Sequence, residues 1–189
     1  MLPISLKERT LTKKQRLLIR ELDEITSIIG IDYWDFSDMA NEERTVRLEL
    51  VKKQIIRGEI LMRYVLLDEL LNDVMCWHVF GRQKKFIRLW RTKKFKAFNY
   101  FILEKLYLIQ KIEYVKFIHR IPKSIENDIY SLNNLRNAIA HSFFPENRKS
   151  KPFWKGKDIF SIEGFKAFED DVQTAIDFFF ERFWKASPG

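Results

Sequence analysis

The clearest helical pattern in this sequence lies in residues 125–141, IENDIYSLNNLRNAIAH. Its large aliphatic residues recur at spacings of four, three, three and four, the period that gives a helix one apolar face. These residues are Ile125, Ile129, Leu132, Leu135 and Ile139. Pro122 fits a first helical turn, and Pro145 stops the pattern shortly after His141. The stretch therefore predicts a core helix that ends near His141.

Helical patterns also fill most of the remaining chain, which has only six glycines and five prolines. That scarcity argues against a β-sandwich or barrel, because those folds need frequent turns. We expect helices over residues 12–29, 38–80, 96–118 and 164–184. Gly58, inside the second of these, suggests a break or a close helix contact. We also expect a short hairpin around Gly156 that pairs residues 153–154 with residues 158–160.

These patterns predict an all-α fold, a bundle of four to six helices with a short hairpin or irregular loop after the helix of residues 125–141. A chain of 189 residues fits a single domain, here with an N-terminal extension over 1–40 and a core over 41–185. The single cysteine, Cys76, excludes an internal disulfide framework and is expected to be a buried small hydrophobe. No segment has the apolar length of a signal peptide or membrane span, so we expect a cytoplasmic protein without a membrane partner.

Positive charge is concentrated in one stretch of the chain. Between Val79 and Leu103 there are eight basic residues and no acidic one. Removing these eight from the 34 basic residues leaves 26, which equals the number of acidic residues. The whole net charge of +8 therefore sits here, and it predicts contact with a polyanion such as RNA. The basic residues are Arg82, Lys84, Lys85, Arg88, Arg91, Lys93, Lys94 and Lys96.

The aromatic residues between these charges allow two interpretations. Trp90 or Phe86 stacks on nucleic-acid bases while the cations follow the phosphates. Alternatively, Phe86, Leu89 and Trp90 pack inward and the charges form a solvated face, which we favour for the aromatic residues. In either case the charges mark the expected polyanion surface.

The polar end of the helix over 125–141 contains an arginine, four intervening residues and a histidine, Arg136 and His141. This segment resembles the HEPN superfamily, whose hallmark is arginine, four to six residues and histidine at the end of a core helix. A polar residue commonly follows the arginine in that family, and Asn137 occupies this position. Many HEPN domains are metal-independent endoribonucleases that dimerise so that two such motifs face one cleft.

The resemblance implies RNA cleavage by a homodimer, without a metal or other cofactor. An RNA 2′-hydroxyl would attack the adjacent phosphorus and leave a 2′,3′-cyclic phosphate. His141 of each protomer would accept or donate the proton, Arg136 would hold the phosphate, and Asn137 would hydrogen-bond the imidazole or the phosphate. Basic residues after the motif are expected to line the cleft: Arg148, Lys149, Lys151, Lys155 and Lys157.

The resemblance also implies a toxin or an antiphage defence effector with an antitoxin or defence partner protein. In a subset of HEPN toxins a tyrosine two residues after the histidine is modified by a nucleotidyltransferase, which silences the toxin. Phe143 stands at that position here, so silencing at this residue is in doubt.

Three alternatives remain open at the level of sequence. In the first, the motif is structural: Arg136 pairs with a core carboxylate and His141 caps the helix. The candidate carboxylates are Asp68, Glu69 and Asp73. In the second, the chain is a non-catalytic HEPN module that binds RNA, nucleotide or a protein partner. In the third, it is a helical interaction protein whose basic stretch docks an acidic partner.

His78 and His119 have no metal-ligand spacing with each other or with Cys76.

Overall fold

The computed structural model describes residues 41–81, 86–140 and 152–185. The chain divides into two compact units, residues 1–55 and residues 56–189. The second unit contains all the described elements except the first part of the longest helix. The predicted helix over residues 12–29 and the predicted extension over 1–40 lie outside the described residues.

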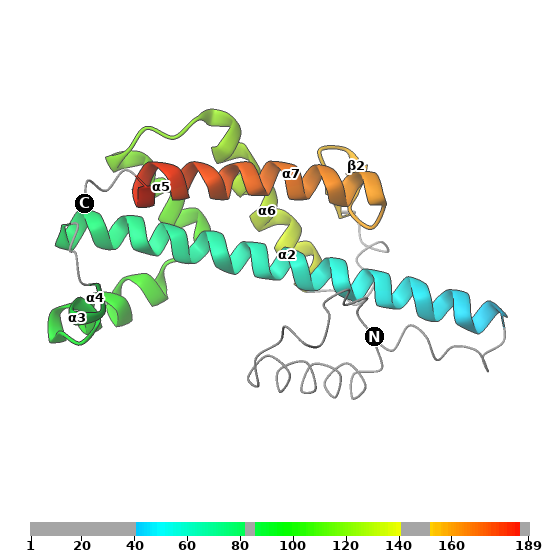
Figure 1. The fold of residues 1–189 in the computed structure, drawn as a ribbon, viewed down its shortest axis with the longest axis horizontal. Coiled ribbons are helices and arrows are strands. Elements are labelled where there is room, and N and C mark those ends of the chain that lie inside the picture. Colours follow the sequence, from blue (N-terminus) through cyan, green and yellow to red (C-terminus); the bar gives the residue numbers. More distant parts are fainter. Residues whose placement is uncertain (1–40, 82–85, 141–151, 186–189) are drawn as a thin grey trace, which may run out of the picture. The chain divides into compact units, whose positions relative to one another are not determined.

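Helix α2, Asn41–Phe80, is the longest element and runs without interruption through Gly58. A Cβ added to Gly58 would meet nothing within 4 Å, so the expectation of a break or close contact there is wrong. Beyond residue 55, the helix runs beside α7, Ile162–Phe179 (Figure 1). Arg63 joins the two helices by donating to Glu169 (2.5 Å) and to Gln173 (2.8 Å).

The segment after α2 differs from the single helix expected over residues 96–118. It forms α3 (Phe86–Trp90), α4 (Lys93–Phe101), the short 3₁₀ turn η2 (Leu103–Lys105) and α5 (Leu108–Ile118). The backbone becomes extended at Leu106 and Tyr107, where the side chain of Gln110 accepts a hydrogen bond from the Tyr107 N–H (2.8 Å) and starts α5. Leu103 and Leu108 are both buried. The dense apolar run is therefore buried around a turn, which a helical pattern alone does not reveal.

Helix α6, Lys123–Ala140, confirms the core helix predicted over residues 125–141. All five aliphatic residues of its predicted apolar face are buried: Ile125, Ile129, Leu132, Leu135 and Ile139. The helix packs against α5 and α7, both of which contribute buried residues to the same hydrophobic core. Burial of this face fixes the rotation of α6, and with it the direction in which its polar residues point.

The predicted hairpin around Gly156 is confirmed, but its second strand lies at residues 157–158 and not at 158–160. Strand β1, Phe153–Trp154, pairs antiparallel with β2, Lys157–Asp158, across the two-residue turn Lys155–Gly156. Both turn residues have positive φ, 47° and 84°, as a tight hairpin turn requires. The buried indole of Trp154 donates its Nε1–H to Asp171 of α7 (2.8 Å), which ties the hairpin to that helix.

Helix α7 begins slightly before the predicted start at residue 164, because Ser161 caps it by accepting from the Gly164 N–H (3.0 Å). It continues into the π-helical segment η4, Phe180–Lys185. The described part of the chain is thus mostly helical, as predicted. Among the described residues no helix combines the length and the apolar character needed to cross a lipid bilayer.

The close approach between the hairpin and α7 yields a stability prediction. A Cβ on Gly164 would collide with the backbone carbonyl of Asp158, which cannot move without disturbing β2. We expect Gly164→Ala to lower the free energy of unfolding by about 1–3 kcal/mol in urea titrations. Gly58→Ala is the matched control, because its Cβ meets no atom and alanine raises helix propensity by about 0.5–1 kcal/mol. If the two variants were equally stable, the close approach of Gly164 to the Asp158 carbonyl would be contradicted.

Candidate functional site

Arg136 lies one turn before the end of α6, at the edge of the hydrophobic core. Its Nη1 donates to Oδ1 of the neighbouring, exposed Asn137 (3.1 Å). The guanidinium carbon lies 5.2 Å from the ring centroid of Tyr64 on α2, within the range of a cation–π contact. The Arg136 Nε is removed from solvent and has no hydrogen-bond partner within the described part of the chain. Tyr64 and Asn137 therefore hold the guanidinium between them.

The carboxylates expected to neutralise Arg136 are engaged elsewhere or lie apart from it. Asp68 pairs with Lys111 of α5 (Oδ2 to Nζ, 2.6 Å). Within residues 41–81, 86–140 and 152–185, no ion pair joins Arg136 to a carboxylate. Burial, and next the charge of Asp68, raise the pKa of Tyr64, while Arg136 opposes the shift, so the phenol stays neutral. The positive charge of Arg136 thus meets an aromatic face and an amide, and it remains available to an anion.

The other predicted members of this site follow α6 directly. His141 comes after the last helical residue, Ala140, and lies outside the described residues. Arg148, Lys149 and Lys151 also lie outside them, as do Arg82, Lys84 and Lys85 of the basic stretch. The structure therefore brings together Arg136, Asn137 and Tyr64, and only the first two were selected from the sequence. The contribution of Tyr64 depends on the packing of α2 against α6, for which the sequence has no local signal.

The described part of the basic stretch is exposed. Arg88 lies on α3, Arg91 follows it, and Lys93 and Lys94 begin α4. Thr92 caps α4 by accepting from the Phe95 N–H (3.1 Å), so these cations are placed on ordered helix ends. The expectation that Phe86, Leu89 and Trp90 pack inward is right for Leu89, which is buried, and wrong for Trp90, which is 52% exposed. The side chain of Phe86 lies outside the described part of the chain.

Lys155, which the sequence analysis placed beside the proposed cleft, joins the hairpin turn to two helices. Its Nζ lies 2.9 Å from Asp128 of α6 and 2.8 Å from Asp171 of α7. Two carboxylates thus compensate this ammonium, which joins the hairpin turn to both helices.

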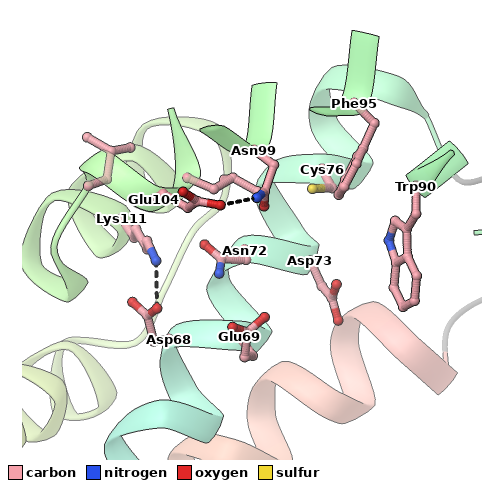
Figure 2. A pocket seen from close by; sticks show the side chains of 12 residues that line it. Asp68, Glu69, Asn72, Asp73, Cys76, Trp90, Phe95, Asn99, Glu104 and Lys111 are labelled. Carbon is pink, nitrogen blue, oxygen red and sulfur yellow. Dashed lines mark hydrogen bonds and ion pairs between the residues drawn. The ribbon is translucent and has the colours of Figure 1, made fainter. Parts of the chain in front are cut away.

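A pocket that the sequence analysis did not anticipate lies between the end of α2 and the segments α3 to α5 (Figure 2). Its volume is about 410 Å³. The side chains around it are mostly acidic, amide or aromatic, with one ammonium group and one thiol. They are Asp68, Glu69, Asn72, Asp73, Cys76, Trp90, Phe95, Asn99, Leu103, Glu104, Leu106 and Lys111. Asp68, Glu69 and Asp73 recur along α2 and were the sequence signal for this pocket, but they were expected to pair with Arg136.

The carboxylates of this pocket are unequally compensated. Asp68 has Lys111, and Glu104 accepts from the amide of Asn99 (2.6 Å). Glu69 and Asp73 lie one helical turn apart on α2, and neither has a cation partner in the described ranges. The pocket therefore holds negative charge that no described side chain neutralises.

Burial, together with this unbalanced charge, shifts two pKa values. Burial, with the charge of Glu69 adding to it, raises the pKa of the Asp73 carboxyl to about 6. Burial also raises the pKa of the Cys76 thiol to about 12, and Asp73 and Glu69 reinforce the shift. Cys76 is 3% exposed, which confirms the prediction of a buried small residue. A thiol that stays protonated in this way is a poor nucleophile.

Across the described part of the chain, no group of three or more histidine, cysteine, aspartate or glutamate side chains is arranged to hold a metal ion. Comparison of the chain with protein-family models, with curated proteins and with solved structures finds no match. Function is therefore inferred from the residues of this chain.

The raised pKa of Asp73 predicts a pH-dependent stability. Its folded-state pKa of about 6 exceeds the usual 3.8, so ionisation above pH 6 costs the folded state more than the unfolded chain. Asp73→Asn should therefore stabilise the protein more at pH 7.5 than at pH 4. We expect the gain in the free energy of unfolding to differ between the two pH values by up to roughly 2–3 kcal/mol. Denaturant titrations at both pH values measure this difference.

Asp170→Asn is the control for this experiment, because Asp170 is an exposed carboxylate on α7 outside the pocket. It should show no comparable difference between the two pH values. If Asp73→Asn and Asp170→Asn respond alike, Asp73 does not carry the uncompensated buried charge described above.

Proposed function

We propose that this protein is an HEPN-type, metal-independent endoribonuclease that acts as a homodimer. The observation that carries the proposal is the guanidinium of Arg136, held by Tyr64 and Asn137 without a carboxylate partner among the described residues. It lies one turn before the end of a core helix, and His141 follows that helix directly in the sequence. An arginine fixed in this way suits a phosphate, which it binds through two parallel N–H donors.

The proposed reaction is a transesterification within RNA. The 2′-oxygen forms a bond to the adjacent phosphorus and gives its proton to His141 of one protomer. The bond from phosphorus to the 5′-oxygen breaks, and that oxygen takes a proton from His141 of the partner. Histidine suits both steps because its ordinary pKa lies near neutrality. Arg136 offsets the charge that develops on the phosphate oxygens.

Exposed cations next to the aromatic residues of α3 and α4 would guide RNA to the protein. Arg88, Arg91, Lys93 and Lys94 are exposed, and the half-exposed Trp90 lies between Arg88 and Arg91 in the sequence. Such a surface binds the RNA backbone electrostatically, while a ring can stack on a base. This activity would suit a toxin or antiphage defence effector controlled by an antitoxin or another partner protein.

One contact favours a second candidate, a non-catalytic HEPN module that binds RNA. The Oδ1 of Asn137 accepts from Arg136, so one of its two acceptor positions is already used before an imidazole N–H can reach it. A module of this kind would keep the phosphate site and lose cleavage.

The cleavage test compares wild-type protein with Arg136→Ala and His141→Ala on a labelled single-stranded RNA in the presence of EDTA. We expect wild type to produce fragments that end in a 2′,3′-cyclic phosphate. Each variant should cleave at least about 100-fold more slowly, since one acid–base group or one charge stabilising the transition state contributes that much. Arg120→Ala and His78→Ala are matched controls at exposed residues outside the motif and should retain activity.

Cleavage that survives Arg136→Ala and His141→Ala would show that the motif is not the active site. RNA binding without cleavage by wild type would establish the second candidate instead. A requirement for added metal would contradict the metal-independent chemistry.

RNA affinity should also depend steeply on salt, because binding releases counterions from the RNA. The double variant Arg91→Ala, Lys94→Ala should weaken binding of every RNA sequence similarly. It should reduce the slope of log affinity against log salt by roughly 0.7 for each phosphate that is no longer neutralised. Filter binding at several salt concentrations measures the slope. An unchanged slope would exclude these cations from the RNA surface.

A further inference from the structure

The pocket at the end of α2 presents several hydrogen-bond acceptors without donors. Glu69 and Asp73 have no cation partner among the described residues. Between them in sequence, the Oδ1 of Asn72 is fully removed from solvent, and no donor reaches it within the described ranges. A buried acceptor without a donor is costly, so the Oδ1 of Asn72 favours a ligand that carries N–H groups, while the exposed Glu69 and the half-buried Asp73 add negative charge beside it.

An aromatic side chain at the same pocket suits a positively charged ligand. The indole of Trp90 is 52% exposed although it lines the pocket, and Figure 2 shows the Asp73 carboxylate on the side of the pocket near this ring. The face of an indole attracts ammonium and guanidinium groups. Phe95, from the next helix, adds a further apolar wall.

The charge of the pocket is opposite to that of the whole chain. Four carboxylates line it against one ammonium, and that ammonium, Lys111, is 3% exposed and pairs with Asp68. Phosphates would be repelled here, so the RNA backbone does not belong in this pocket. Its volume of about 410 Å³ falls within the range of small-molecule sites.

We propose that this pocket binds a small organic cation, an alkyl polyamine or an alkylguanidine. Glu69 and Asp73 pair with the cationic groups, the Oδ1 of Asn72 accepts an N–H, and Trp90 covers the charge with its ring. The Asp68–Lys111 pair and the Asn99–Glu104 hydrogen bond hold the walls in place. This site uses none of the proposed catalytic residues, although it shares Trp90 with the proposed RNA surface.

The test measures binding of spermidine and of agmatine by calorimetry at pH 7.5 to full-length protein freed of nucleic acid. We expect saturable binding at one site for at least one of the two probes. Glu69→Gln and Asp73→Asn should each weaken it about tenfold or more, because each removes a charged hydrogen-bond acceptor. Trp90→Leu should weaken it as well, while Asp170→Asn, which removes an exposed carboxylate elsewhere, should leave it unchanged.

Thermal unfolding of each variant separates loss of binding from loss of fold, since Asp73→Asn is expected to stabilise the protein at this pH. The proposal is overturned if neither probe binds saturably, or if Glu69→Gln and Asp73→Asn bind like wild type. Competition by magnesium ions at equal concentration would show that the pocket is an unspecific acidic patch, and this result would also overturn the proposal. Binding of guanosine in place of both cations would assign the pocket to a nucleobase instead.

Discussion

Burial of one aliphatic face of α6 is the constraint on which the rest of this structure depends. Ile129 and Leu132 are wholly inaccessible to solvent, and side chains of this size each contribute about 1.5–3 kcal/mol when buried. Because this face is fixed against its neighbours, Arg136 must lie at the edge of the core. There its aliphatic stem is covered while its guanidinium reaches Tyr64 and Asn137. The proposed phosphate site is thus a consequence of how the core is packed.

Charges divide into a compensated and an uncompensated set around this core. Hydrogen bonds from Lys116 and Lys123 lower the pKa of the buried Glu126, and the bond from Lys116 joins the start of α6 to α5. Lys155 satisfies the acidic residues of α6 and α7 at the hairpin. By contrast, Arg136 has no carboxylate and Glu69 and Asp73 have no cation in the described part of the chain. Unpaired charges of opposite sign at two separate places suit ligands of opposite sign, RNA phosphate at one and an organic cation at the other.

The sequence was informative where a short stretch determines its own structure. The apolar face of α6 follows from its spacing, and the hairpin at Gly156 follows from its turn residues. The turn at Leu106–Tyr107 was missed because the apolar run around it matches a buried helix as well as two short elements. The acidic pocket was missed for a different reason. Its walls come from several elements, so Asp73 and Trp90 meet only after the chain has packed.

The proposed function depends most directly on Arg136, which must provide an unneutralised guanidinium for the RNA phosphate. Nitrogen-15 NMR of the arginine Nε–Hε signals tests this, during titration with a 2′-O-methyl oligoribonucleotide that lacks the attacking hydroxyl. We predict a saturable shift of the Arg136 signal, assigned by its loss in Arg136→Lys, while the signal of the exposed Arg120 stays in place. An Arg136 signal that is unchanged at saturating oligonucleotide would contradict a phosphate site at this residue.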